Sequence, residues 1–285
     1  MNPSRPTPLQ VLTNLGKALC YLLLFLSSQM VLSMIATISI SLSMAGQDTL
    51  PADPDGMMEA LMEQLLAYTP HITLFSALLT LVVLAILFAI LRRNPLTSVT
   101  LRPVHPAVVL IGAAIAPMLY LVVVVALSLL PEAWVEAYDQ ATVGLDSTGV
   151  MAFLATALAA PIVEEVVFRG LILTRLNRVM PGWLAVVLSA LVFGLCHGQA
   201  VWVGYAFVLG LTFGALTLRS RSILPAMACH IVFNTIGQLT TLLQQNPNAQ
   251  LALLGSLVVV GAAAALILRP AVRRASARLN QSAPL

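Results

Sequence analysis

The chain has 285 residues, of which 59% are hydrophobic and only 9% are charged. Soluble domains carry about a quarter of charged residues, so this composition excludes a soluble globular protein and indicates a polytopic membrane protein. The net charge of +3 is small, and the basic residues are spread over several loops, which excludes a nucleic-acid-binding patch. No alternating strand pattern is present, and backbone in lipid must satisfy its own hydrogen bonds, so we expect an all-α fold.

The first half of the chain contains three long apolar runs. The first covers about 18–44 after a polar start, and the others cover about 71–91 and 107–130. A cleaved signal peptide is the alternative for the first run, but this run is longer than the core of a signal peptide. We therefore expect three membrane spans here.

Two acidic stretches separate these runs from their neighbours. Residues 45–56 form a turn-rich loop, and residues 57–68 place methionines and leucines on one helical face with Glu59 and Glu63 opposite. This pattern predicts a helix lying on the membrane surface, with a substrate gate as the alternative. His71 is expected to be interfacial rather than a ligand. The second acidic stretch, 131–147, contains Asp146, and its Trp134 and Tyr138 suit an interfacial anchor.

The second half predicts five further spans, at about 148–173, 183–199, 201–218, 222–244 and 250–268. The Arg-rich end, 269–285, is expected to be a disordered cytoplasmic tail. We expect one transmembrane domain over 1–285, with no internal repeat.

The charges predict the orientation of these eight spans. With the N-terminus in the cytoplasm, every Lys and Arg except Arg169 falls on the cytoplasmic side, and every acid except Glu164 and Glu165 falls on the other side. Cytoplasmic loops are enriched in basic residues, so both termini are predicted to be cytoplasmic. We expect the protein in a bacterial-type plasma membrane.

Polar side chains interrupt three of the predicted spans. Glu164, Glu165 and Arg169 lie in the fourth span, and a charge at that depth costs at least a few kcal/mol unless it has a partner or faces water. Glu165 and Arg169 are four residues apart and can pair on a helix. Glu164 lies roughly 100° round the helix from Glu165 and is left free.

The other intrusions are His197 near the end of the fifth span, and His230 and Asn234 on one face of the seventh. A polar network that only joins helices is the alternative to a functional cluster. Cys196 and Cys229 each precede one of these histidines and are interpreted as packing residues rather than nucleophiles. Cys20 also lies in an apolar run, so no disulfide framework or zinc-finger spacing is present.

Small residues surround these positions. Pro161 removes an N–H just before the glutamates, which frees a backbone carbonyl one turn earlier and favours a kink. The pairs Gly194 and Gly198, and Gly210 and Gly214, have the spacing of close helix packing.

Glu-Glu-x-x-x-Arg (Glu164, Glu165, Arg169), Phe-x-x-x-His (Phe193, His197) and His-x-x-x-Asn (His230, Asn234) follow one another on successive predicted helices. In this order the motifs resemble the CPBP family, which comprises type II CAAX prenyl endopeptidases and bacteriocin-processing or immunity proteins, also called Abi. The resemblance covers about 150–245, and we place the catalytic core at 148–245.

The resemblance implies an intramembrane endopeptidase. In such an enzyme Glu164 would be the general base with His197 as its partner, and His230 and Asn234 would stabilise the oxyanion. Glu165 and Arg169 would be the supporting pair. The implied partners are membrane lipid and a peptide or protein substrate, either prenylated or a bacteriocin or peptide precursor.

These roles suit the chemistry of the residues. A carboxylate removed from bulk water can take up a proton near neutral pH, and preorganised N–H donors stabilise an oxyanion where water is scarce. Counted from the cytoplasmic ends of the helices, the cluster is predicted to open toward the cytoplasm.

Three alternatives stay open. His197, His230 and Glu164 could bind Zn²⁺ with a water molecule as fourth ligand, although we favour a reaction without a metal. The chain could be a non-catalytic immunity or scaffold protein of the same family. It could also be a proton-coupled transporter, but no paired broken helices are present.

Overall fold

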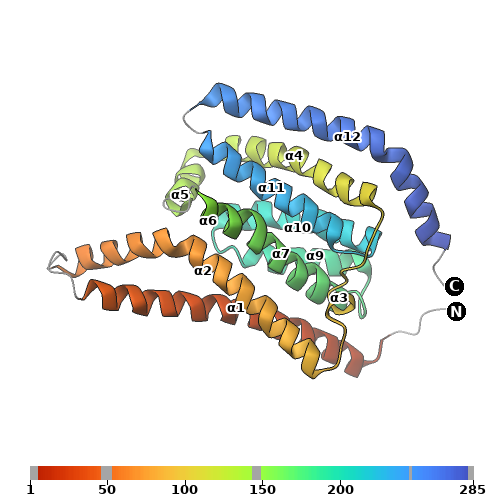
Figure 1. Ribbon diagram of the computed structural model, residues 1–285, viewed down its shortest axis with the longest axis horizontal. Coiled ribbons are helices and arrows are strands. Elements are labelled where there is room, and N and C mark those ends of the chain that lie inside the picture. Colours follow the sequence, from red (N-terminus) through yellow and green to blue (C-terminus); the bar gives the residue numbers. More distant parts are fainter. Residues whose placement is uncertain (1–5, 46–52, 143–148, 244–245, 282–285) are drawn as a thin grey trace.

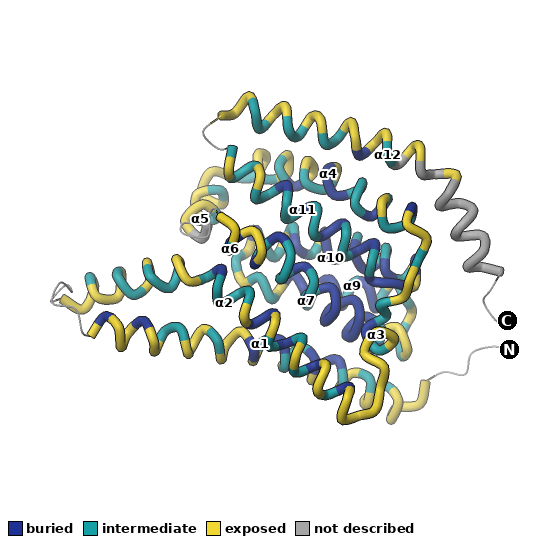
Figure 2. Tube along the Cα trace, viewed as in Figure 1, coloured by how far each residue is buried: buried dark blue, intermediate teal, exposed yellow. Residues whose placement is uncertain are grey.

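The computed structural model describes residues 6–45, 53–142, 149–243 and 246–281. Every regular element in these residues is a helix, which confirms the all-α membrane fold. Helices stack side by side in a layered bundle, with the first residues of α1 and the last residues of α12 on the same side (Figure 1). Buried positions concentrate on the central helices, whereas the first helical hairpin and the last helix are largely exposed (Figure 2).

Helices α1 (Pro8–Met44) and α2 (Pro54–Ile90) form a long antiparallel hairpin along one edge of the bundle. Each has 37 residues, about 55 Å at 1.5 Å per residue, which exceeds the roughly 30 Å hydrocarbon core. Thr7 and Asp53 cap their N-termini with side-chain oxygens. The hairpin is therefore long enough to cross the membrane and project beyond it.

The separate surface helix predicted over 57–68 is wrong. These residues form the first turns of α2, which runs on through Pro70 into the second apolar run. A proline inside a membrane helix is tolerated because neighbouring groups can satisfy the freed backbone carbonyl. The amphipathic stretch is thus an extension of the second span.

The next elements connect this hairpin to the core. They are α3 (Pro95–Ser98), α4 (Pro106–Ser128) and α5 (Glu132–Thr142). Trp134 on α5 is exposed, and Tyr138 meets the ring of Trp202 edge-on at 6.1 Å between centroids. Asp146 lies outside the described residues.

The motif-bearing fourth segment is one helical rod, Val150–Leu176, with an unusual hydrogen-bond pattern. It comprises α6 (Val150–Ala152), η1 (Phe153–Ala159), α7 (Ala160–Glu164), η2 (Glu165–Leu173) and α8 (Thr174–Leu176), where η denotes π-helix. All nine residues of η2 are buried. Such π-type stretches are rare and often mark functional sites.

Four helices complete the bundle: α9 (Gly182–Leu195), α10 (Ala200–Ser220), α11 (Leu224–Leu242) and α12 (Pro247–Gln281). The fifth predicted span, 183–199, is too long, since α9 ends at Leu195. Gly198 then turns the chain at φ +76°, and the Gln199 side chain accepts hydrogen bonds from the first N–H groups of α10. The predicted disorder over 269–285 is also wrong as far as Gln281, because Ala, Arg and Leu favour helix there. Residues 282–285 lie outside the described residues.

All eight predicted spans coincide with helices. Among the described residues, six helices are long and apolar enough to cross a membrane. These six do not include α9, which is short, or α11, which carries the His-x-x-x-Asn motif. The multi-pass architecture is established, whereas the number of eight spans and the cytoplasmic position of both termini stay predictions.

Three of the four paired glycines serve close packing, as predicted. A Cβ added at Gly194 would lie 2.8 Å from the Val203 carbonyl oxygen. A Cβ added at Gly210 would lie 2.9 Å from Ala190, and one added at Gly214 would lie 3.0 Å from Val186. These contacts hold α9 against α10. Gly198 has open space instead, so its role is the turn and not packing.

The glycine contacts predict a position-specific effect on stability. Gly210→Ala should destabilise the protein by about 1–3 kcal/mol, because its methyl group would overlap the Ala190 backbone. Gly204→Ala on the same helix is the control, since nothing lies within 4 Å of an added Cβ there. Thermal unfolding in detergent measures both variants. Equal stability of the two would contradict the packing role of Gly210.

Candidate active site

Three segments that are distant in the sequence meet in the centre of the bundle. Glu164 and Glu165 lie where α7 passes into η2, His197 follows α9, and His230 and Asn234 lie on α11. Helix α7 packs against α11, and η2 packs against α9 and α10. The three motifs therefore form one site.

A buried ion pair anchors this site. Arg169 Nη1 lies 3.2 Å from Glu165 Oε1, with both side chains shielded from solvent, which confirms that they pair. The guanidinium also lies over two rings, 4.2 Å from the centroid of Phe193 and 5.1 Å from that of Phe213. Cation–π contacts of this kind strengthen where water is excluded. No sequence motif includes Phe213, so its contact with Arg169 could not be predicted.

His230 lies between the two glutamates. Its Nδ1 is 3.0 Å from Glu165 Oε1, and since a carboxylate accepts, the Nδ1–H donates. Its Nε2 is 3.7 Å from Glu164 Oε2, too long for a hydrogen bond but close enough to influence that carboxylate. The ring stacks on Phe213 at 4.7 Å between centroids. His230 thus has a fixed orientation and links the buried pair to Glu164.

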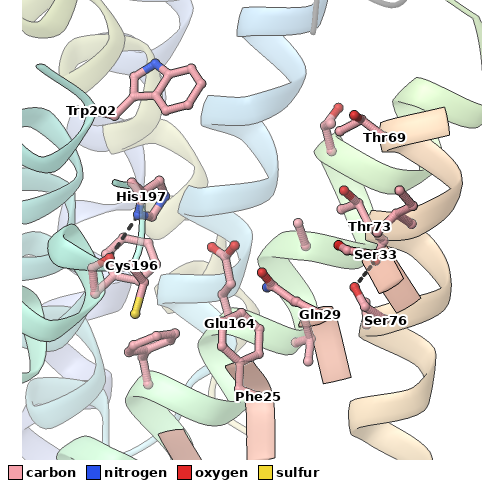
Figure 3. Close-up of a pocket in the computed structure, with 17 residues that line it drawn as sticks. Phe25, Gln29, Ser33, Thr69, Thr73, Ser76, Glu164, Cys196, His197 and Trp202 are labelled. Carbon is pink, nitrogen blue, oxygen red and sulfur yellow. Dashed lines mark hydrogen bonds between the residues drawn. The ribbon is translucent and has the colours of Figure 1, made fainter. Parts of the chain in front are cut away.

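Glu164 faces a cavity, in contrast to Glu165. Its side chain is 17% exposed, whereas that of Glu165 is fully buried. The cavity has a volume of about 480 Å³ and lies between the α1–α2 hairpin and the motif-bearing helices (Figure 3). Its polar lining, besides Glu164, consists of Gln29, Ser33, Thr69, Thr73, Ser76, Thr156, Cys196, His197 and Trp202.

His197 lies on the wall opposite the hairpin, beside Cys196 (Figure 3). Its Nδ1 is 2.9 Å from the Phe193 carbonyl oxygen. A carbonyl can only accept, so Nδ1 carries the proton and the neutral ring leaves Nε2 as an acceptor. The spacing Phe-x-x-x-His therefore fixes the tautomer of His197.

Asn234 is held by the unusual helix that carries the glutamates. In a π-helix the N–H of residue i bonds to the carbonyl of residue i−5, as the Ala160 N–H does with Ala155. The next residue, Pro161, has no N–H, which leaves the Thr156 carbonyl without its helical donor. Asn234 Nδ2 donates to this oxygen at 2.8 Å. The kink predicted at Pro161 is thus a π-type region whose open carbonyl is satisfied by α11.

The predicted oxyanion donors do not line the cavity. His230 is 4% exposed and lies behind Glu164, and the Asn234 amide is engaged with the Thr156 backbone. The described structure brings Glu164 and His197 to the cavity and keeps His230 and Asn234 outside it. The motif residues meet in one site as predicted, but only Glu164 and His197 face the cavity.

Residues 146–236 match the family model of type II CAAX prenyl endopeptidases described as Rce1-like. This segment is therefore similar to the type II CAAX prenyl endopeptidases. The match covers about a third of the chain and contains all three motifs, which confirms the predicted family. Comparison with curated proteins and with solved structures gave no match.

Similarity to a protease family does not by itself decide whether the reaction uses a metal ion. Within the described residues, no three His, Cys, Asp or Glu side chains form a group that could hold a metal ion. His230 directs Nδ1 to Glu165 and Nε2 toward Glu164, so both of its nitrogens face carboxylates. In this arrangement His197, His230 and Glu164 do not come together as a three-ligand group, and the metal-free reaction favoured from the sequence stays a prediction.

The cavity opens at an unexpected end. On each helix, the lining residues nearest the arginine-rich ends are buried, namely Phe25, Ala77, Phe168 and Phe193. Farther along, Gln29 and Ser33 on α1 are exposed, and Thr69 and Thr73 on α2 are half-buried. The mouth lies away from the arginine-rich helix ends, so the predicted cytoplasm-facing opening does not agree with the predicted orientation of the helices. Burial of Phe25, Phe168 and Phe193 closes that side.

The contact between Asn234 and Thr156 predicts a coupled mutational effect. Asn234→Leu should destabilise the protein by about 1–3 kcal/mol, since it leaves the Thr156 carbonyl unsatisfied. Pro161→Ala restores an N–H that can bond to this carbonyl, so Asn234→Leu should cost less in that background. A double-mutant cycle of thermal unfolding measures the coupling. Additive effects would show that Pro161 and Asn234 do not share this oxygen.

Proposed function

We propose that the protein is an intramembrane endopeptidase in which Glu164 activates a water molecule. The observation that carries the proposal is that the two adjacent glutamates have different surroundings. Glu165 is committed to Arg169 and His230, while Glu164 faces a cavity with polar walls. The family match supports peptide hydrolysis as the reaction class.

The proposed reaction proceeds by proton transfer through Glu164. A water molecule between Glu164 and the Nε2 acceptor of His197 can donate to both groups. Glu164 removes a proton from this water as its oxygen attacks the carbonyl carbon of the scissile peptide bond. The protonated Glu164 then returns the proton to the amide nitrogen. The C–N bond breaks, and a carboxylate and an amine are released.

The remaining polar residues act through Glu164 or stabilise the intermediate. Glu165 and Arg169 fix His230, and His230 in turn holds its Nε2 toward Glu164. Of the two residues to which the family implies an oxyanion role, His230 stays in place beside Glu164, and Asn234 would have to turn toward the cavity when substrate binds. Asn234 Nδ2 keeps a second hydrogen for this purpose, beside the one given to Thr156.

The substrate is proposed to be a peptide or protein segment that reaches a membrane cavity. Prenylated proteins and bacteriocin or peptide precursors are the substrate classes that the family suggests. About 480 Å³ accommodates several residues of an extended chain around the scissile bond, not a folded domain. Lipid surrounds the enzyme in the proposed bacterial plasma membrane, and the reaction needs no cofactor.

Loss of the Glu164 carboxylate should abolish most activity. We expect Glu164→Gln to lower kcat about 10²–10⁴-fold, because the amide cannot accept the water proton. Cleavage of a quenched fluorescent peptide library by purified protein in detergent measures this loss. Cys196→Ala is the control, since Cys196 lines the same cavity and should be dispensable. Normal turnover by Glu164→Gln with loss in Cys196→Ala would indicate a cysteine nucleophile instead.

A strong chelator should leave cleavage unchanged. His197, His230 and Glu164 do not form a three-ligand group, so removal of free metal should have no target in this site. The same peptide assay measures activity before and after chelation. Activity lost to the chelator and restored by Zn²⁺ would contradict the proposed reaction and place these three residues at a metal. A His230→Ala variant that no longer responds to Zn²⁺ would identify the ligand.

A further inference from the structure

The cavity is closed at the arginine-rich side by an aromatic layer. Phe25 meets Phe168 edge-on at 5.5 Å between ring centroids, and Phe168 meets Phe193 at 5.1 Å. Beyond this layer the core continues through Leu84, Phe88, Val167 and Leu171, all at most 2% exposed. Neither water nor an extended peptide can reach Glu164 through this packing.

The opposite half of the cavity has a polar wall. Gln29 and Ser33 on α1 are exposed and line the cavity, and Thr69, Thr73 and Ser76 on α2 lie beside them (Figure 3). Gln29 and Glu164 line the same cavity (Figure 3). Polar side chains at membrane depth favour a wet cavity over lipid. The Gln29 amide and Ser33 hydroxyl can both donate to and accept from a peptide backbone.

The distribution of charged residues indicates on which side of the membrane the polar half of the cavity opens. Arg92, Arg178 and Arg221 are exposed at the helix ends below the aromatic layer. Glu132 and Glu136 on α5 are exposed on the side of the cavity mouth, where Tyr138 contacts Trp202. Because basic residues mark the cytoplasmic side, the mouth faces the other side.

We propose that the peptide substrate enters the site from the extracytoplasmic side, along the polar wall of the α1–α2 hairpin. The substrate is then a polypeptide segment exposed outside the cytoplasm or in the outer leaflet, and not the C-terminus of a cytoplasmic protein. This inference rests on the proposed protease function. It narrows the substrate classes to secreted peptide precursors and extracytoplasmic segments of membrane proteins.

Thiol labelling tests the side of access without any substrate. Ser33→Cys would be introduced with Cys20→Ser and Cys196→Ser, while the buried Cys229 remains. A charged, membrane-impermeant methanethiosulfonate reagent is added to right-side-out and to inverted membrane vesicles. We expect Ser33→Cys to react in right-side-out vesicles. Thr97→Cys, exposed at the arginine-rich side, should react only in inverted vesicles.

Met34→Cys is the matched control at the same depth. Met34 is 57% exposed but does not line the cavity, so its thiol should face lipid and stay unmodified in both preparations. Modification of Ser33→Cys in inverted vesicles alone would overturn the proposal, as it would show a cytoplasmic opening. Protection of Ser33→Cys in both preparations would also overturn it, since the cavity would then not connect to water.

Cleavage in the two vesicle preparations separates this inference from the protease function. A peptide cleaved by the detergent-purified protein is added outside the vesicles, and we expect loss of intact peptide only with right-side-out vesicles. Glu164→Gln vesicles correct for other proteases. Cleavage restricted to inverted vesicles would contradict the access side while leaving the protease function standing. Absence of cleavage in detergent would contradict the protease function, and the labelling pattern would still decide the access side.

Discussion

The site depends on the cost of burying ionised groups among apolar helices. Arg169 is fully buried, and its charge is balanced by Glu165 and by the faces of two phenylalanine rings. A buried charge without such partners would cost several kcal/mol. Glu165 also accepts from His230, so the charge balance fixes the ring that lies next to Glu164. The ion pair that neutralises Arg169 thereby also holds the His230 ring beside Glu164.

The second constraint is the backbone of the helix that carries the glutamates. Pro161 within a π-type segment leaves the Thr156 carbonyl without a helical donor, and Asn234 supplies one from α11. A second π-type carbonyl, that of Phe168, accepts from the Ser189 hydroxyl of α9. Irregular helix is thus stabilised by hydrogen bonds from its neighbours, in the way that membrane proteins satisfy freed backbone groups.

The α1–α2 hairpin, which carries none of the family motifs, supplies the other wall of the cavity. Its packing against η2 and α8 closes one end, and its polar residues face Glu164 at the other. The family-matched segment carries Glu164 and His197, while the N-terminal third of the chain shapes the space in front of them. The region outside the family match therefore shapes the cavity that Glu164 faces.

The sequence by itself determined the membrane class, the positions of eight helical segments and the pairing of Glu165 with Arg169, because hydropathy and i,i+4 spacing are local properties. It also identified the family, since the three motifs are contiguous patterns. Only the tertiary structure decided that α2 is continuous, that Arg169 lies over the rings of Phe193 and Phe213, and that the cavity opens away from the arginines. These features arise from contacts between segments that are distant in the sequence. Gln29, for example, lines the cavity only because α1 packs beside the helix that carries Glu164.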